Sequence, residues 1–145
     1  MTFVERHGLW SDEQREAARA MRKVAEEKNL ETIRFSFADQ HGILRGKTLI
    51  AAEAIASLES GCGITTSLLA KDTSHKTVFP VFTAGGGFGL KEMEGAADAL
   101  MVPDPLTFRT LPWSPGTGWP ASWGAMCGSS SLNRWNSTSS PATKS

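Results

Sequence analysis

The residues best suited to chemistry in this sequence lie in one polar stretch, residues 71–76. Asp72, Ser74 and His75 fall within four positions there, and an acid, a hydroxyl and an imidazole are the components of a nucleophile–base set. No oxyanion-hole motif accompanies them, and polar residues this close together are typical of an exposed loop. A small hydrolase that uses Ser74, or the thiol of Cys62 between two glycines, is one hypothesis. A surface loop and a small buried cysteine are the simpler alternative.

Three other features have simple structural explanations. The glycine-rich run 84–89 lacks the Lys-Ser/Thr pair of a phosphate-binding loop and the βαβ setting of a dinucleotide site, which indicates a surface loop. Arg45-Gly46-Lys47 is a compact basic group whose spacing favours a solvated strand face. His7 and His41 add no metal-ligand spacing to His75, and His41 is expected to be solvated in a turn. The residue types alone therefore define no active site.

Hydrophobic periodicity predicts the elements that position these groups. Ser11 opens a capping box with Gln14 and begins an amphipathic helix over 12–28. Alternating apolar residues predict a half-buried strand over 32–38, with Ile33, Phe35 and Phe37 on one face and Arg34 and Ser36 on the other. An Asp-Gln-His-Gly turn and a returning strand over 43–50 complete a hairpin.

Shorter elements follow the hairpin, and together they predict an α+β domain on a small mixed sheet. They are a helix over 51–60, strand propensity over 64–70, an apolar stretch over 77–82 that Pro80 interrupts, a buried strand over 99–102 and a further strand around Phe108 and Leu111.

Composition excludes several classes of protein. The 145 residues include 15 Lys and Arg against 15 Asp and Glu, and a nucleic-acid binder needs a clear basic excess. Two cysteines are too few for a disulfide framework or a zinc site. No apolar run approaches the roughly 20 residues of a membrane span, and the start of the chain lacks the apolar core of a signal peptide. The sequence thus predicts a cytoplasmic protein with no nucleic-acid or membrane partner.

The charge is unevenly distributed along the chain. Residues 1–104 hold all 15 acidic side chains and 12 of the 15 basic ones. Residues 120–145 contain eight serines and a single aliphatic Leu, Ile or Val, which is Leu132. Such a stretch cannot bury enough surface to offset the entropy of ordering.

Three segments together carry a resemblance to a known family. They are Ile33 to Lys47, with an Asp-Gln-His-Gly turn and Arg-Gly-Lys; Ala97 to Arg109, with Pro-Asp-Pro-Leu-Thr-Phe-Arg; and Leu111 to Trp119, which begins Leu-Pro-Trp. Over about residues 30–119 the sequence resembles the N-terminal portion of the glutamine synthetase superfamily, and it is most similar to the glutamine-synthetase-like branch that includes γ-glutamyl-amide synthetases.

The resemblance implies a β-grasp domain, so the predicted fold is a β-grasp-like small mixed sheet with a packed helix, preceded by an N-terminal helix. It also implies a ligase of nitrogen metabolism, as in glutamine biosynthesis, that joins the γ-carboxylate of glutamate to ammonia or an amine. In this family ATP and Mg or Mn serve the reaction in a C-terminal catalytic domain, and the β-grasp domain closes the site of a neighbouring subunit in a ring-shaped homo-oligomer. This chain itself is expected to bind no cofactor or metal.

The sequence departs from the family by lacking that catalytic domain, so we expect a truncated chain that is inactive on its own. Some members lend an acidic residue to the neighbour's ammonium site from a loop that matches residues 63–67, where no acid stands here. The resemblance leaves Ser67, Asp72 and His75 as inter-subunit loop candidates.

The predicted organisation has three parts. Residues 1–30 form an N-terminal helical segment, 31–119 the β-grasp domain and 120–145 a Ser-rich disordered tail. A frame change near codon 119–120 explains the tail's composition, and a natural disordered tail is the alternative. A different function, a stand-alone β-grasp binding module that recruits a partner through Val78 to Phe82 or a sheet edge, also remains open.

Overall fold

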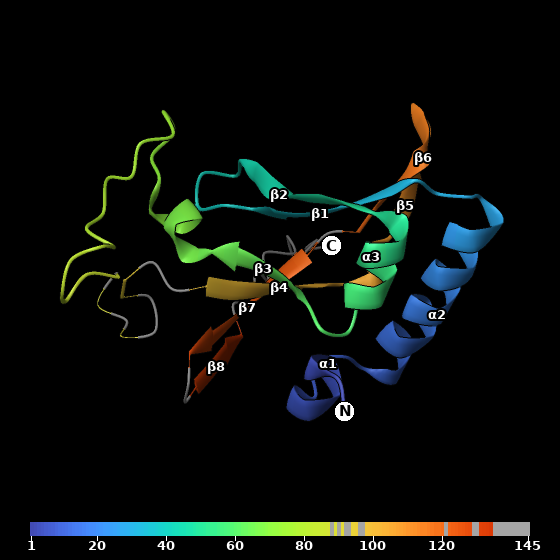
Figure 1. The fold of residues 1–145 in the computed structure, drawn as a ribbon, viewed down its shortest axis with the longest axis horizontal. Coiled ribbons are helices and arrows are strands. Elements are labelled where there is room, and N and C mark those ends of the chain that lie inside the picture. Colours follow the sequence, from blue (N-terminus) through green and yellow to red (C-terminus); the bar gives the residue numbers. More distant parts are fainter. Residues whose placement is uncertain are drawn as a thin grey trace, which may run out of the picture.

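The computed structural model describes residues 1–87, 89, 91, 94, 95, 98–120, 122–128 and 131–134, the last two stretches by their backbone alone. The chain alternates short helices and strands (Figure 1). The helices are α1 (Phe3–His7), α2 (Asp12–Glu27) and α3 (Ala51–Ser57), with 3₁₀ turns η1 (Thr66–Ala70) and η3 (Pro105–Thr107). The strands are β1 (Thr32–Ala38), β2 (Leu44–Ile50), β3 (Cys62–Thr65), β4 (Asp98–Pro103), β5 (Arg109–Leu111), β6 (Ser114–Trp119), β7 (Ser122–Gly128) and β8 (Ser131–Arg134).

Helix α2 begins at the predicted capping box. The Ser11 hydroxyl accepts from the Gln14 backbone N–H at 3.2 Å, and the Gln14 side chain accepts from the Ser11 backbone N–H at 3.0 Å. Both bonds satisfy amides that a helix start leaves unpaired. Asn29 follows the helix with φ of 47°, a left-handed conformation that ends it.

Two four-stranded sheets form the centre of the molecule, with orders β2-β1-β6-β5 and β3-β4-β7-β8. The β1–β2 hairpin is antiparallel in continuous register from Thr32↔Ile50 to Ala38↔Leu44. Strand β6 runs parallel to β1, with Thr32 opposite Thr117. In Figure 1, α2 lies at the right-hand end of the molecule, and the segment after η1 extends at the left-hand end, beyond the tip of the hairpin.

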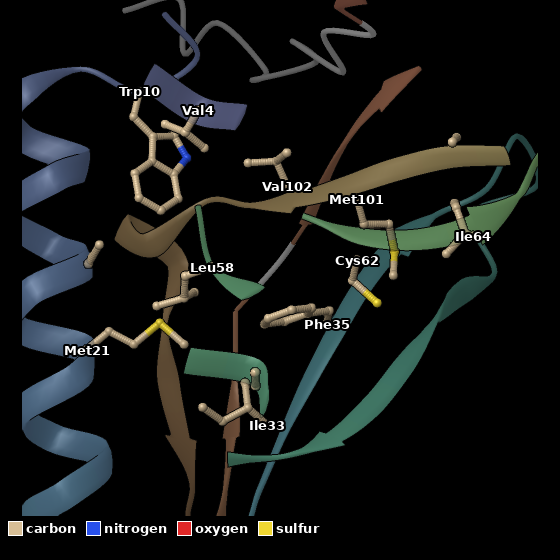
Figure 2. Packing of buried hydrophobic residues seen from close by; sticks show 13 residues of the cluster. Val4, Trp10, Met21, Ile33, Phe35, Leu58, Cys62, Ile64, Met101 and Val102 are labelled. Atoms are coloured by element: carbon tan, nitrogen blue, oxygen red, sulfur yellow. The ribbon is translucent and has the colours of Figure 1, made fainter. Parts of the chain in front are cut away.

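One hydrophobic cluster joins the helices to both sheets (Figure 2). Ile33 and Phe35 of β1 and Met101 of β4 are fully enclosed, and Met21 of α2 is 1% exposed. Val4, Trp10 and Ala18 of the N-terminal segment belong to the same cluster. The N-terminal helices therefore share their core with the sheets.

The architecture confirms the predicted α+β class: a small domain consistent with a β-grasp-like fold, with an N-terminal helix. Ile33 and Phe35 are buried on the predicted apolar face, and Ser36, on the other face, is buried as well. Its hydroxyl accepts from the indole N–H of Trp119, which covers that face of β1.

Strand propensity over 64–70 was misleading. The strand ends at Thr65, whose hydroxyl accepts from the Ser67 backbone N–H at 3.4 Å and caps the 3₁₀ turn η1. A side chain that caps its own backbone offers an alternative to the sheet ladder. The chain therefore leaves the sheet after Thr65, although strand propensity continues through Ala70.

Part of the tail is described by its backbone. The backbone of β7 pairs with β4, with Leu100 opposite Ala125, and β7 pairs with β8. Residues 121, 129, 130 and 135–145 lie outside the described residues, and the disordered tail over 120–145 stays a prediction. The domain boundaries and the frame change stay predictions.

Candidate functional site at the hairpin tip

The turn between β1 and β2 is organised by one carboxylate. Asp39 Oδ1 accepts hydrogen bonds from the backbone N–H groups of His41 and Ile43, at 2.8 and 2.9 Å. Gly42 has φ of 74° and donates its N–H to the Asp39 carbonyl at 2.9 Å. An Asp that bonds to backbone two residues on and a glycine with positive φ are the turn chemistry that the sequence predicts.

The second oxygen of Asp39 holds Arg45, the first residue of the Arg-Gly-Lys group. Arg45 Nε donates to Asp39 Oδ2 at 2.8 Å, and the two side chains are only 6% and 1% exposed. The prediction of a solvated strand face is therefore wrong for Arg45, because its charge is paired across the hairpin with a buried carboxylate. Opposite charges six residues apart, on either side of a turn, were the available sequence signal.

Burial and hydrogen bonding act in opposite directions on the pKa of Asp39. Burial raises it, but the hydrogen bond from Arg45 and those from the Ile43 and His41 amides outweigh burial, so its pKa lies below the ordinary value. The carboxylate is therefore charged at neutral pH and available as the partner of Arg45.

A second Asp organises the loop that follows η1. Asp72 Oδ1 accepts from the backbone N–H groups of Ser74 and Lys76 and from the Ser74 hydroxyl, each at 2.9 Å. The bond from the Lys76 amide is the main cause that lowers the pKa of Asp72, followed by the Ser74 hydroxyl. His75 has φ of 67°, a left-handed conformation that is uncommon outside glycine and is tolerated best by Asn, Asp and His. The loop thus holds a tight, specific conformation.

The loop 71–77 docks on the hairpin tip. Arg45 Nη1 lies 2.6 Å from Nε2 of the His75 ring. His41 Nε2 and Gln40 Nε2 lie 3.1 and 3.3 Å from the carbonyl oxygen of Lys71, and Lys71 Nζ donates to the His75 carbonyl at 3.1 Å. We call this contact the tip cluster; it consists of the turn 39–45 and the loop 71–77.

The structure brings together two of the three predicted loop candidates. Asp72 and His75 share the loop, and the His75 backbone N–H donates to the Asp72 carbonyl at 3.1 Å. Ser67 belongs instead to η1, where its Oγ lies 3.0 Å from the hydroxyl of Thr65. The expected loop at 63–67 is thus the end of β3 followed by a 3₁₀ turn.

The hydrolase hypothesis gains no geometric support. The Ser74 hydroxyl donates to Asp72, and the His75 ring contacts Arg45, so each side chain of the supposed set has a different partner. Cys62 is buried, with 9% of its surface exposed, in agreement with its interpretation as a small buried residue. In the glycine-rich run, Gly85 and Gly87 adopt positive φ and Phe88 lies outside the described residues.

The described part of the chain holds neither a cluster of metal ligands nor a membrane-spanning helix. Among residues 1–87 and 98–120, no three His, Cys, Asp or Glu side chains are grouped as ligands for a metal ion. The described residues thus offer no ligand set for the Mg or Mn that the resemblance assigns to the family's catalytic domain. None of the described helices is both long and apolar enough to cross a bilayer.

Comparison with known proteins identifies the family. No family model matches the chain. A γ-glutamylanilide synthase from Acinetobacter sp. is 42% identical over 122 residues, which cover 82% of this chain and 24% of that protein. The solved structure of apo GmaS without ligand superposes with a TM-score of 0.54 and 26% identity, over 74% of this chain and 21% of that one. The chain belongs to the glutamine-synthetase-like family.

This glutamine-synthetase-like chain spans about a quarter of the length of the relative it matches. A structure of a GmaS/ADP complex, conformation 1, aligns over 71% of the chain with 28% identity and a TM-score of 0.48. The 42% identity and the match to apo GmaS confirm the resemblance to the N-terminal portion of the family, which the hairpin and the Pro-Asp-Pro segment first indicated. The tip cluster lies in that portion.

Proposed function

We propose that this chain provides the N-terminal domain of an ATP-dependent ligase that joins the γ-carboxylate of glutamate to ammonia or an amine. The observation that carries the proposal is the 42% identity over 122 residues to a γ-glutamylanilide synthase. The name of that relative favours an amine over ammonia as the nitrogen donor. Nitrogen metabolism and a cytoplasmic location belong to the same proposal.

The proposed reaction has two steps, phosphorylation of the carboxylate and displacement of the phosphate by the amine. An oxygen of the glutamate γ-carboxylate attacks the terminal phosphorus of ATP, and the bond to ADP breaks, giving an acyl phosphate. The nitrogen lone pair of the amine then attacks the acyl carbon, phosphate leaves, and the nitrogen loses a proton. Positioning and charge neutralisation dominate phosphoryl transfer of this kind.

The proposed part of this chain in the reaction is to cover the active site of a neighbouring subunit in a homo-oligomer. The tip cluster suits that part because the loop 71–77 is exposed yet held by hydrogen bonds to the hairpin. Apolar side chains follow directly, with Val78 and Phe82 exposed by 55% and 71%. An anchored polar loop beside exposed apolar groups is a surface that a second subunit can cover.

A chimera tests the proposal directly. The segment of the Acinetobacter γ-glutamylanilide synthase that matches this chain is replaced by residues 1–119, and γ-glutamylanilide and ADP formation are measured. We expect turnover within about tenfold of the parent enzyme, since related domains preserve packing better than surface detail. A chimera that assembles like the parent but makes neither product contradicts the proposal.

The 145-residue polypeptide alone provides the matching control. We propose that it releases no ADP from ATP in the presence of glutamate and an amine, because it spans only a quarter of the length of its relative. Its folding is verified by circular dichroism before the assay. Turnover by the purified polypeptide would show that it carries a complete active site.

The stand-alone binding module remains the second candidate, and the exposed Val78, Phe79 and Phe82 favour it equally. The two functions differ in the partner. A ligase domain restores activity in the chimera, whereas a binding module leaves the chimera inactive and forms a defined complex with a different protein. Sedimentation of the chimera with its activity assay separates these outcomes.

A further inference from the structure

A cleft lies between α1, α2 and the segment that follows α3. Its cavity has a volume of about 210 Å³, and its apolar lining consists of Val4, Trp10 and Ala18. These three side chains belong to the hydrophobic cluster, and each is at most 6% exposed. Figure 2 shows the Trp10 ring beside Val4, next to α2. The cleft therefore has an apolar floor that is part of the core.

Hydrogen bonds hold the walls of the cleft in place. The Val4 N–H donates to the Glu59 carbonyl at 2.9 Å, which joins α1 to the segment after α3. Arg22 of α2 donates to the carbonyl of Ile55 at 3.2 Å and to the carboxylate of Glu59 at 2.9 Å. Bonds from α1 and α2 thus converge on one segment, so the cleft is formed in the absence of a ligand, as is usual for small-molecule sites.

Positive charge predominates around the cleft, because three arginines and two acids line it. The arginines are Arg15, Arg19 and Arg22, whose spacing places them on one face of α2. The charge of Arg22 is already compensated by Glu59. Arg15 and Arg19 are exposed, and they are the cations that a ligand in the cleft can reach.

Arg15 and Arg19 have only weak partners within the described residues. The Arg15 guanidinium makes no hydrogen bond or ion pair there, and it attracts the Glu5 carboxylate by charge alone. That carboxylate already accepts from the Thr2 backbone N–H at 2.8 Å. Arg19 pairs with Glu16, which does not line the cleft, and a pair this exposed contributes little. A carboxylate that enters the cleft can therefore bind both guanidiniums.

We propose that the cleft binds a small organic carboxylate, whose charged group lies between Arg15 and Arg19 and whose apolar part lies on the floor at Trp10. Guanidiniums bind carboxylates through paired, charge-assisted hydrogen bonds. The volume is below the roughly 300–1,000 Å³ of pockets for drug-sized ligands, which favours a molecule of one ring. The proposal concerns this chain alone and does not rest on the proposed function.

An NMR titration of the 145-residue chain with benzoate tests the site. The indole N–H signal of Trp10 and the backbone amides of Ala18 and Arg22 should shift and saturate in the millimolar range, the affinity expected of so small a ligand. Amides of the β1–β2 ladder, such as Phe35, should not shift. The absence of a saturable shift up to about 50 mM benzoate would overturn the proposal.

Two analogues separate the contribution of the arginines from that of the floor. Benzamide has the same ring but no charge, so it should bind at least about tenfold more weakly than benzoate. Inorganic phosphate has charge but no apolar part, and it should also bind at least about tenfold more weakly. Benzamide as tight as benzoate would show that the arginines do not recognise the ligand. Phosphate as tight as benzoate would show a basic surface with no use of the floor, and either result contradicts the proposal.

Matched substitutions on α2 locate the carboxylate of the ligand. Arg15→Gln and Arg19→Gln should each weaken benzoate binding about tenfold. Lys23→Gln is the control, because Lys23 is exposed, lies outside the lining and pairs with Glu27. It removes the same charge and should leave the affinity within about twofold. Urea unfolding verifies that each variant is folded. Equal weakening by Arg15→Gln and Lys23→Gln would assign the effect to net charge and refute the site.

Discussion

The indole Nε1 of Trp10 donates a hydrogen bond to the carbonyl oxygen of Pro103, 3.2 Å away and 93 residues later in the chain. Trp10 precedes α2, and Pro103 ends β4. A second bond runs alongside, from Gln14 Nε2 to Asp104 Oδ1 at 3.0 Å. These two hydrogen bonds connect the start of α2 and the residue before it to the Pro-Asp-Pro segment, which carries part of the family resemblance.

Substitution of Trp10 should destabilise the chain in two separable increments. Trp10→Phe leaves the Pro103 carbonyl without its donor and should cost about 1–2 kcal/mol of unfolding free energy. Trp10→Ala also removes a buried aromatic side chain and should cost about 3–5 kcal/mol. Urea unfolding measures both. Trp113→Phe, at a position that is 76% exposed, is the control and should change stability by less than about 0.5 kcal/mol.

The glycine in the Arg-Gly-Lys group should not accept a side chain. A Cβ at Gly46 would lie 1.9 Å from the carbonyl oxygen of Phe35 on the paired strand. Gly46→Ala must therefore separate β1 from β2, at a cost of about 3 kcal/mol or more. Gly63→Ala is the matched control, because a Cβ there meets nothing within 4 Å. If the two variants unfold at the same denaturant concentration, the close approach of β1 and β2 at Gly46 would be contradicted.

The buried ion pair should matter more than the exposed ones. Arg45→Met leaves the Asp39 carboxylate buried without its cation, which is a larger penalty than the loss of a solvated pair. Arg19→Ala removes the exposed pair with Glu16, where both side chains are more than two-thirds exposed, and should cost about 0.5 kcal/mol or less. Thermal unfolding of both variants at one pH makes the comparison. A similar loss for the two would show that Arg45 is hydrated in solution.

Stability should fall when the solution is acidified below the ordinary aspartate range. The pKa values of Glu5, Asp39 and Asp72 are all lowered in the folded chain; the Glu5 pKa is lowered chiefly by the backbone amide hydrogen bond at Thr2. A lowered pKa means that the charged form is stabilised by folding. That contribution is complete well above the ordinary Asp value of 3.8 and is lost as the pH falls below it toward the lowered pKa.

Urea midpoints from about pH 7 to about pH 3 measure this dependence. Asp72→Asn should flatten the curve at its acidic end, because an amide does not titrate. Asp98→Asn serves as the control, since Asp98 is an exposed residue at the start of β4. The same flattening in both variants would assign the effect to overall charge rather than to the bonds at Asp72.

Local sequence signals predicted the elements that local chemistry decides. The capping box at Ser11, the stripe that buries Met21 and the turn at Asp39 each depend on residues a few positions apart, and each is present in the structure. Contacts between distant segments gave no such signal. Strand β6 was not predicted, because its Pro and Gly content argues against a strand and only its pairing with β1 makes it one.

The candidate site divides in the same way. Asp72 and His75 were recognised by residue type and by family resemblance, and the loop that contains them is exposed as expected. Their anchor was missed, because spacing alone places Arg45 on a strand face and cannot reveal that a loop thirty residues later covers it. Burial of a charged side chain is a tertiary property, and only the fold supplies it.

The parallel pairing of Thr32 with Thr117 constrains the order in which the protein folds during its synthesis. As the chain emerges N-terminus first, the β1–β2 hairpin can form from neighbouring residues, but the open edge of β1 stays unpaired until β6 has been made. Trp119, the last residue of that strand, then covers Ser36. Until β6 has been made, the nascent chain carries an exposed strand edge beside Phe35. An unpaired edge can pair with another chain, so misassembly is favoured most at this stage.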